Sequence, residues 1–539
     1  MSIPVIDLFA GPGGLGEGFS RATGASFQTV ISIEKDGMAH ETLRLRAAHR
    51  HLARNGASED DWKTWDGIIE RESWNIVFNQ LKECGNARIR EACIAADHEA
   101  LELELGPACR EEVTREIRKR LKPYMTGGKY PNNAVLIGGP PCQAYSIVGR
   151  SRNRGQKDYV PELDHRHFLY EEYLHVITEF RPAVFVMENV KGILSSRVGE
   201  RQIFEKILSD LRKPGLADGT AKRLEYVLVP LTAHATGVEP EPDDFLLKAE
   251  GFGVPQARHR VIILGVRKDV FSAAGTIRKL LPSPAPTVQK VIGDLESLRP
   301  QISSRGKGMH WSDALSLPLF DEAVRTLHSM GDQGREIAAV MTSARQNIQT
   351  RQVDPGPGAE RSRVLPTTRS ARLGSLATWY KDRSTTLMTN HESRAHMPSD
   401  LVRYLFVAAF GKATGSSPRL ADFPRCLLPA HKNVDPDNAG ESIFKDRFRV
   451  QLASRHSMTI TSHIAKDGHA FIHYMPKQCR SLTVREAARL QTFPDSYVFL
   501  GNRTSQFTQV GNAVPPLLAV QIAEVVASVL AAAATKSGC

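Results

Sequence analysis

Short runs of apolar residues alternate with stretches of helical periodicity over roughly the first 267 residues. Unbroken Val, Ile and Leu runs are typical of strands that are buried on both faces, and their alternation with helices indicates an α/β sheet. We therefore expect an α/β fold with a largely parallel sheet in this part of the chain. The predicted strands are Pro4–Phe9, Thr29–Ile33, Ala134–Ile137, Val184–Met187 and Val261–Val266.

The pattern departs from this alternation in two places. Residues 55–125 are charged, helical in pattern and poor in strand signals, so we expect an insertion between two strands of the sheet. Residues 268–455 have scattered Gly, Pro and Arg and only weak periodicity, which predicts a separate, smaller domain. Within it, the stretch Arg351–Arg372 has the composition of a basic loop.

Helix and strand patterns return over residues 456–539, which we assign to the same domain as residues 1–267. Thr483, followed three residues later by Glu486, predicts the capped start of a helix. The apolar stretch Pro515–Ala534 is interrupted by a Gln and a Glu, and this predicts a buried helix and no membrane span.

Composition narrows the class of protein. The 539 residues suffice for two or three domains, and a net charge of +11 suits a polyanionic partner. The seven cysteines form no C-x-x-C pair, so we expect neither a zinc ribbon nor another metal site. The first residues carry no secretory signal pattern, so a cytosolic protein with reduced thiols is expected.

A glycine-rich turn follows the first predicted strand. The stretch Val5–Phe19 has the order strand, glycine turn and helix start, and the second strand ends in an acid, Glu34, 23 residues after Gly11. Glycines let a ligand approach the backbone, and a carboxylate at that distance can accept hydrogen bonds from ribose hydroxyls. The pattern predicts an adenosine-containing cofactor in a Rossmann-like sheet, but leaves NAD and S-adenosylmethionine both open.

A cysteine follows another predicted strand. Cys142 comes after two prolines, Pro140 and Pro141, which fix the backbone beyond the carboxyl end of Ala134–Ile137. A thiolate in such a place is a candidate nucleophile, whereas an isolated cysteine is more often a small buried residue. The next stretch, Ser146–Lys157, is rich in Arg and Gly and reads either as a solvated loop or as a basic lid over nucleic acid.

Taken together and in this order, several segments resemble the motifs of the DNA cytosine-5 methyltransferases of bacterial restriction-modification systems. The resemblance covers roughly residues 1–50, 130–195, 250–267 and 456–530. The matching segments are Asp7–Gly14, Pro140–Gln143, Glu188–Val190, Gln256–Arg260, Arg480–Pro494 and Gly511–Val514.

The resemblance implies a reaction and a role for four side chains. Cys142 would attack C6 of a cytosine that is flipped out of duplex DNA, which makes C5 nucleophilic toward the methyl group of S-adenosylmethionine. Glu188 would lie against N3 of the base. Arg258 and Arg260, placed on one face by strand periodicity, would stabilise the developing charge.

The resemblance also implies a role for each domain and a set of contacts. Residues 1–267 and 456–539 would form the catalytic domain, and residues 268–455 the target-recognition domain. The family usually has an acid on a third strand that binds the adenine amine; this residue is not placed here, and Asp66 is a weak candidate for it. The implied cofactor contacts are Asp7, Phe9, Gly11, Gly13, Leu15, Glu34, Pro141 and Asn512, and the implied DNA contacts are Gln143, Ser146, Arg150, Arg152 and Arg154.

Three other functions stay open at this point: an RNA cytosine-5 methyltransferase, a catalytically silent DNA-binding relative, and a dinucleotide oxidoreductase. The last leaves Pro140–Gln143, Glu188–Val190 and Gln256–Arg260 unexplained. We expect a cytoplasmic, nucleoid-associated monomer on double-stranded DNA. The recognised sequence and the presence of a cognate restriction endonuclease or defence system are left open.

Overall fold

The computed structural model describes residues 2–141, 169–198, 201–217, 224–232, 239–306, 308–363, 373–381, 387–430, 434 and 447–537. The chain forms two compact units: Met1–Pro284 with Ala513–Cys539, and Ala285–Asn512. These limits lie away from residues 267 and 456, the predicted boundaries, and they place residues 456–512 in the second unit. The assignment of functions to the domains stays a prediction.

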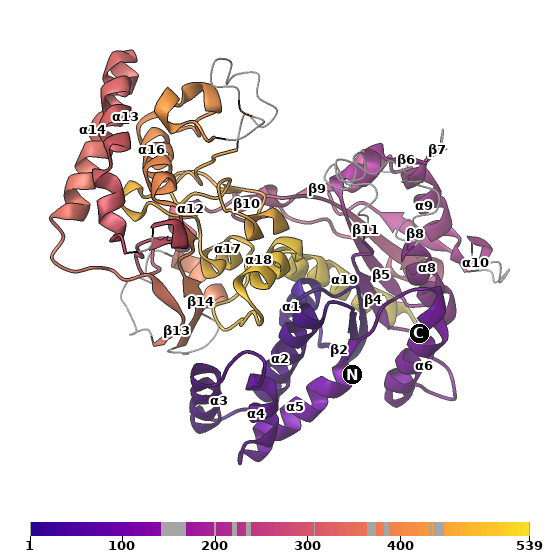
Figure 1. Ribbon diagram of the computed structural model, residues 1–539. Coiled ribbons are helices and arrows are strands. Elements are labelled where there is room, and N and C mark those ends of the chain that lie inside the picture. Colours follow the sequence, from indigo (N-terminus) through magenta and orange to yellow (C-terminus); the bar gives the residue numbers. More distant parts are fainter. Residues whose placement is uncertain are drawn as a thin grey trace. The chain divides into compact units, whose positions relative to one another are not determined.

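The first unit is built on an eight-stranded mixed sheet of order β3-β2-β1-β4-β5-β11-β8, with β9 also paired to β11 (Figure 1). The five strands expected from the sequence are all present. β3, β8 and β9 are additions that the apolar pattern did not reveal. The bounds are β1 Ile3–Leu8, β2 Phe27–Glu34, β3 Ala100–Glu102, β4 Val135–Gly138, β5 Val184–Val190, β8 Tyr226–Val229, β9 Leu246–Lys248 and β11 His259–Arg267.

The strand order defines where a ligand can bind. β1 pairs in parallel with both β2 and β4, β2 with β3, and β4 with β5, whereas β11 runs antiparallel to β5. The chain moves outward from β1 through β2 to β3 and then returns to β4 on the other side of β1. This reversal is a topological switch point, and the crevice beyond the carboxyl ends of β1 and β4 is the expected ligand site of such a sheet.

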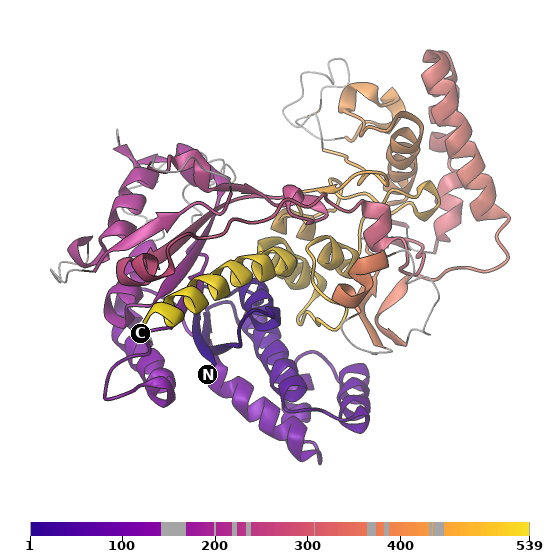
Figure 2. The ribbon, with the colours of Figure 1, turned by 180° about the vertical axis from the view of Figure 1, so that it is seen from behind.

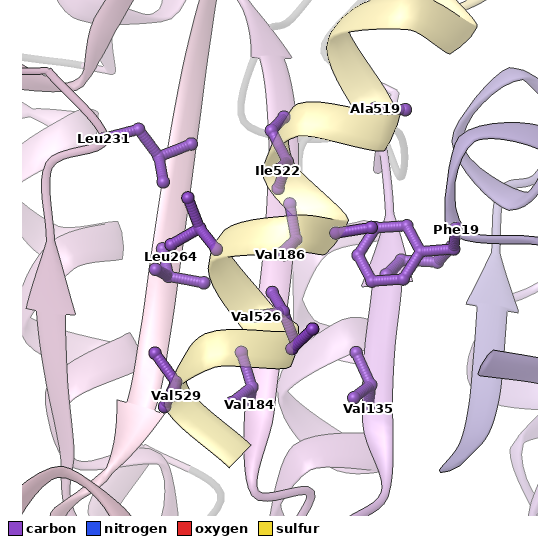
Figure 3. Packing of buried hydrophobic residues seen from close by; sticks show 14 of the residues in the cluster. Phe19, Val135, Val184, Val186, Leu231, Leu264, Ala519, Ile522, Val526 and Val529 are labelled. Carbon is purple, nitrogen blue, oxygen red and sulfur yellow. The ribbon is translucent and has the colours of Figure 1, made fainter. Parts of the chain in front are cut away.

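Helices cover both faces of the sheet, as the near-continuous apolar strands require. One face packs against α1, α11 and α19, and the other against α6, α8 and α9. In Figure 3, Ile522, Val526 and Val529 of α19 lie over the strand residues Val184 and Leu264. The bounds are α1 Gly14–Arg21, α6 Arg110–Leu121, α8 Leu169–Phe180, α9 Ile203–Arg212, α11 Lys268–Ala274 and α19 Pro516–Ser537.

The polar interruptions of α19 have defined partners. Glu524 accepts hydrogen bonds from the backbone N–H of Thr23 (2.6 Å) and Gly24 (3.1 Å), and Gln521 donates to the carbonyl of Phe252 (2.9 Å). The segment Arg503–Thr535 is long and apolar enough to cross a membrane by length and composition alone. The apolar side chains of α19 are packed in the core of the sheet, so α19 is a core helix. Figure 2 shows this helix, in yellow, alongside the sheet.

The region expected as a helical insertion also holds part of the sheet. β3 lies within this region, pairs with β2 and forms one edge of the sheet. Residues 55–125 therefore contribute a strand as well as helices. The strand escaped prediction because it has three residues, one of them a glutamate. The helices of this part of the chain are α2 Gly37–Arg54, α3 Glu59–Arg71, α4 Val77–Glu83 and α5 Ala87–Glu99.

The second unit is more regular than its weak periodicity predicted. The expected basic loop Arg351–Arg372 contains a strand, β13, that pairs antiparallel with β14, while residues 364–372 lie outside the described residues. The principal elements are α12 Val288–Ile292, α13 Pro318–Ser329, α14 Gly331–Gln349, β13 Gly358–Arg363, β14 Leu387–Glu392, α16 Pro398–Thr414, β16 Ser457–Met458, α17 Val484–Leu490 and α18 Arg503–Asn512.

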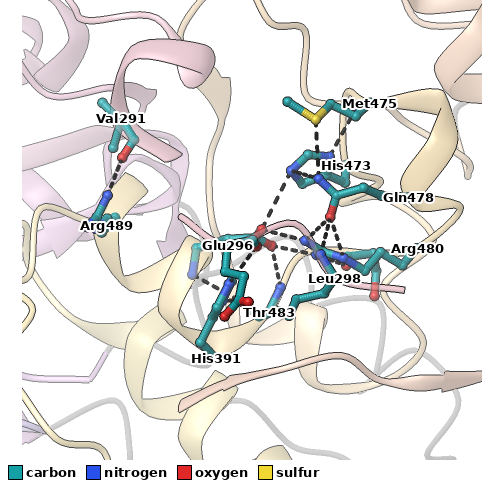
Figure 4. Close-up of polar contacts among 12 residues, drawn as sticks. Val291, Glu296, Leu298, His391, His473, Met475, Gln478, Arg480, Thr483 and Arg489 are labelled. Carbon is teal, nitrogen blue, oxygen red and sulfur yellow. Dashed lines mark hydrogen bonds and ion pairs between the residues drawn. The ribbon is translucent and has the colours of Figure 1, made fainter. Parts of the chain in front are cut away.

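A buried polar network surrounds α17 (Figure 4). The predicted capping box is confirmed: the Thr483 side chain accepts from the Glu486 N–H, and the Glu486 carboxylate accepts from the Thr483 N–H. Arg480 holds the same carboxylate through two contacts of 2.7 Å, and Arg489 pairs with Asp495 in the same bidentate way. Fully buried charges need such partners, so the segment Arg480–Pro494 acts as an internal scaffold.

Candidate active site

The register of the sheet brings the predicted motifs to one place. Leu8, the last residue of β1, pairs with Gly138 at the end of β4, and Gly138 pairs with Met187 of β5. Glu188 follows Met187 and faces Ile262 of the antiparallel strand β11. The loops that follow β1 and β4, the acid on β5 and the start of β11 therefore meet at one edge of the sheet, beside the switch point.

The glycine loop is held in a conformation that few residues adopt. Phe9, Gly11 and Gly13 have φ angles of 55°, 57° and 97°, and Gly13 directly precedes α1. The Glu34 carboxylate accepts the Gly11 N–H at 2.7 Å and the Asp36 N–H at 2.8 Å. These two bonds orient Glu34 at the end of β2, and no described heavy atom occupies the space that a Gly11 Cβ would face. The left-handed backbone conformation of Phe9 costs conformational energy, and strained residues of this kind are typical of ligand sites.

Asp7 is buried beneath this loop. Its side chain is about 1% exposed, and neither carboxylate oxygen has a hydrogen-bond partner among the described residues. A Cβ at Gly16 would lie 2.9 Å from Oδ2, so a larger residue on this turn of α1 would press on the Asp7 carboxylate. Burial raises the pKa of Asp7 well above its usual value, although Arg50 opposes the shift. Leu15, another predicted cofactor contact, packs in the hydrophobic core.

Next to Asp7 lies a set of buried ion pairs that the sequence did not reveal. Glu17 of α1 makes two contacts with Arg46 of α2, at 2.6 and 2.8 Å. Arg50 pairs with Glu99, the last residue of α5, and His51 contacts the same carboxylate at 2.9 Å. Burial alone would raise the pKa of Glu17, but Arg46 lowers it to about 2. The region before β3 is thereby tied to α1 and α2, which adjoin the glycine loop and β2.

Glu188 and Arg260 form an ion pair at this edge of the sheet. Arg260 Nε lies 2.9 Å from Glu188 Oε1, and the two side chains are 15% and 13% exposed. The other carboxylate oxygen is 2.9 Å from where a Gly139 Cβ would be, so the acid lies against the loop that leads to Cys142. Arg258 is fully buried, and burial together with the nearby Arg260 lowers its pKa, against the effect of Glu188.

The second residue of the Glu188–Val190 motif acts on the same loop. Asn189 donates from Nδ2 to the Pro140 carbonyl at 3.2 Å, and its own Oδ1 accepts the Val190 N–H at 2.8 Å. Asn189 therefore fixes the backbone two residues before Cys142. Pro141 is partly exposed and is the last described residue of this loop. The predicted residues Cys142, Gln143, Ser146, Arg150, Arg152 and Arg154 lie outside the described residues.

Neither Asp66 nor Asn512, both predicted cofactor contacts, lies on the sheet of the first unit. Asp66 lies on α3 and not on a strand, whereas the third strand, β3, carries Glu102 and is followed by Glu104. Both glutamates are more than half exposed, and Glu104 contacts Lys35 at 3.0 Å. Asn512 is exposed and is the last residue of the second unit.

The residues after Asn512 return to the glycine loop and α1. The Val514 carbonyl oxygen would be 2.2 Å from a Gly14 Cβ, and Ala519 packs as closely on Gly18. Two glycines on α1 are thus required for the approach of α19. The close packing of Gly14 on Val514 explains why the glycine motif ends in two adjacent glycines.

Comparison with known proteins identifies the family of the chain. The sequence profile of the C-5 cytosine-specific DNA methylases matches residues 108–218 and 241–528. The type II methyltransferase M.Bpa9945I of Bacillus paralicheniformis is 30% identical over 98% of this chain and 99% of its own length. The DNA (cytosine-5-)-methyltransferase M.ApeKI of Aeropyrum pernix is 26% identical over 74% of this chain and 81% of its own.

One solved structure aligns with nearly the whole chain. It is a DNA modification methyltransferase encoded within a prophage of Escherichia coli, 17% identical, with a TM-score of 0.48 over 98% of this chain and 99% of its own. The profile covers most of the chain, and one relative matches nearly all of it. The chain therefore belongs to the C-5 cytosine-specific DNA methylase family and is a DNA (cytosine-5-)-methyltransferase.

Proposed function

We propose that the chain transfers a methyl group from S-adenosylmethionine to C5 of a flipped-out cytosine in a specific duplex sequence, through a covalent bond between Cys142 and C6. The observation that carries this proposal is the register of β1, β4, β5 and β11. It brings the glycine loop, the described residues Gly139–Pro141 that precede Cys142, and the Glu188–Arg260 pair to one edge of the sheet.

The residues of the glycine loop fit the proposed cofactor. S-Adenosylmethionine, when bound, supplies an electrophilic methyl group. Glu34 retains free acceptor positions on an oriented carboxylate and would hold the ribose hydroxyls. The open space at Gly11 lets a ligand approach the backbone, and the unpaired carboxyl of Asp7 lies buried beneath the same loop. Glu102 or Glu104, at the end of β3, replaces Asp66 as our candidate for the adenine amine.

In the proposed reaction, the other side chains take the following roles. The Cys142 thiolate adds to C6 of the cytosine, and the electron pair moves through the ring toward N3. Glu188 would share or donate a proton at N3, and its ion pair with Arg260 supports a fixed orientation of that carboxylate. The buried Arg258 adds positive charge close to the same acid. After methyl transfer, loss of the C5 proton expels Cys142 and restores the aromatic ring.

The test is a trap for the covalent bond. Duplex DNA that contains 5-fluorocytosine keeps the adduct because fluorine cannot leave as the proton does. We expect an SDS-stable protein–DNA band with the wild type in the presence of S-adenosylmethionine, and none with Cys142→Ala, which should still bind the cofactor. An adduct on RNA alone would move the activity to RNA, and no adduct on either substrate would indicate a silent relative.

The type II relatives support a role in restriction and modification. We propose that a cognate endonuclease recognises the same duplex sequence and that the methyltransferase acts as a monomer in the cytoplasm, where the DNA is. Mass photometry on a single-site duplex measures the stoichiometry. DNA methylated by the purified protein should resist cleavage by the cognate endonuclease. Cleavage of fully methylated DNA would contradict the proposal that the two enzymes recognise the same sequence.

A further inference from the structure

A buried tyrosine on α8 contacts both strands that lead into the site. The Tyr173 hydroxyl donates to the Val186 carbonyl of β5 at 2.9 Å and, in a longer contact, to the Leu136 carbonyl of β4 at 3.4 Å. The side chain is fully buried, and burial raises the pKa of Tyr173 well above its usual value, so the phenol keeps its proton and donates. Tyr173 belongs to none of the motif segments, so no motif assigns it a role.

The ring of Tyr173 supports the end of β4. A Cβ on Gly138, the last residue of β4, would lie 3.1 Å from the ring atom Cε2 and 2.5 Å from the Leu8 carbonyl oxygen. A glycine at this position therefore lets the ring pack directly on the strand end. The Phe185 ring of β5 meets Tyr173 edge to face, with 6.2 Å between the ring centroids. Contacts with both strands thus fix the orientation of the phenol.

The hydroxyl of Tyr173 forms the first of two ties between β4 and β5. It contacts these strands two residues before Glu188 on β5 and two residues before Gly138 on β4. The second tie is the hydrogen bond from Asn189 to the Pro140 carbonyl, at 3.2 Å. Between the two ties, β5 carries Glu188, and the chain after β4 continues in sequence toward Cys142. Movement of one strand end against the other would change the position of Glu188 relative to the residues that precede Cys142.

We propose that Tyr173 is a positioning residue for the methyl transfer: by joining the carboxyl ends of β4 and β5, it fixes Glu188 relative to the residues that precede Cys142. The inference rests on the proposed function and adds a buried residue that acts only through the two strands. Reacting groups must be held in a near-attack geometry, and a misplacement of about 1 Å can cost about 10²-fold in rate. A hydrogen bond close to both strand ends limits such a misplacement.

The chain offers a matched tyrosine at the opposite end of β5. Tyr226, on β8, is also buried, and its hydroxyl donates to the Pro182 carbonyl at 2.7 Å, two residues before β5 begins. Its ring contacts the same Phe185, with 5.1 Å between the ring centroids. Tyr226→Phe therefore removes the same kind of buried hydrogen bond beside the same strand, but at the amino end, away from Glu188.

The rate of covalent adduct formation on duplex DNA that contains 5-fluorocytosine tests the positioning role. Tyr173→Phe keeps the ring and removes the hydroxyl, so we expect this rate to fall about tenfold, which is part of the loss for a full misplacement. Tyr226→Phe should keep the wild-type rate. Both variants should lower the thermal midpoint by a similar amount, on the order of 2 °C for one buried hydrogen bond. The affinities for S-adenosylmethionine and for DNA should be unchanged in both.

Amide hydrogen exchange tests the tie itself, whether or not the enzyme reacts. Loss of a local hydrogen bond lowers the free energy of local opening, so the nearest amides should exchange faster. We expect faster exchange at the carboxyl ends of β4 and β5 in Tyr173→Phe, and at the amino end of β5 in Tyr226→Phe. The two variants therefore separate the two ends of one strand.

The outcomes separate this proposal from the proposed function. Equal adduct rates in the two variants overturn the positioning role, because the rate would then follow stability or would not depend on the hydroxyl at all. A loss of cofactor affinity in Tyr173→Phe at the wild-type adduct rate also overturns it. A wild type that forms no adduct refutes the proposed reaction. Unchanged exchange at both strand ends in Tyr173→Phe refutes the tie, whether or not the wild type reacts.

Discussion

At the scale of single residues, the ion pair between Glu188 and Arg260 is the feature most directly tied to chemistry. Glu188→Gln keeps the size of the side chain but removes the charge that Arg260 orients. Because a positioned proton donor or acceptor contributes about 10²- to 10⁴-fold, we expect kcat to fall within that range. An assay of methyl transfer to duplex DNA measures kcat. Calorimetry should show that the affinity for S-adenosylmethionine is unchanged.

A surface carboxylate provides the control for Glu188. Glu179, on α8 of the first unit, pairs with Arg118 at 2.8 Å and belongs to none of the motifs. Glu179→Gln removes a carboxylate from an arginine pair in the same way and should leave kcat unchanged. Equal activity of the Glu188→Gln variant and the wild type would contradict the role given to Glu188.

Asp7 links ligand binding to stability at the same scale. Because burial raises its folded-state pKa, its contribution to stability is present below the unfolded pKa of about 3.9 and is lost as pH rises. Asp7→Asn cannot ionise, so we expect it to raise the thermal midpoint at pH 7.5 more than at pH 4.5, while weakening cofactor affinity. Thermal melts and calorimetric titration measure the two effects, and a lower midpoint at pH 7.5 would contradict the argument.

At the scale of elements, the capping box of α17 gives a stability prediction. Thr483→Ala removes the acceptor for the Glu486 N–H and the contact of 3.0 Å with His391. We expect unfolding free energy to fall by about 1 kcal/mol or somewhat more, as for other caps. Urea denaturation measures it, and Thr483→Ser, which keeps the hydroxyl, should recover most of the loss.

The same elements show what a sequence pattern can and cannot predict. Strands such as Val184–Met187 were found because strands buried on both faces are unbroken apolar runs. β3 was missed because it has only three residues, one of them a glutamate, at the edge of the sheet, and Glu102 and Glu104 were therefore not considered for the adenine amine. The motifs singled out Glu188 and Arg260 as candidate site residues. The hydrogen bond from Asn189 to the Pro140 carbonyl depends on the register of β4 and β5, which no local sequence pattern encodes.

At the scale of the whole molecule, buried histidines predict how stability depends on pH. Burial lowers the pKa of His391 to about 4 and that of His473 to about 3. The unfolded chain would therefore bind more protons than the folded one between about pH 6.5 and pH 4, and stability should rise with pH across that window. A histidine whose pKa is lower by one in the folded chain than in the unfolded chain contributes about 1.4 kcal/mol to this dependence, so the fall in the melting midpoint on acidification should be readily measured.

A variant separates this effect from general acid denaturation. His391→Gln should flatten the midpoint-against-pH curve between pH 4.5 and 6.5, whereas His328→Gln, an exposed histidine on α13, should not. Carboxylates such as Glu17, whose pKa is about 2, contribute only below the unfolded value of about 4.3. An unaltered curve for His391→Gln would show that the histidines do not set the pH dependence.

The hydrophobic core of the first unit draws on two segments that are separated by the whole second unit. Phe19 and Val5 share it with Leu518 and Ile522 of α19. During translation, the sheet is made early but lacks its covering helix until the ribosome has passed the second unit. The enzyme should thus stay inactive as a nascent chain, and two fragments divided just before α19 should regain activity only when they associate.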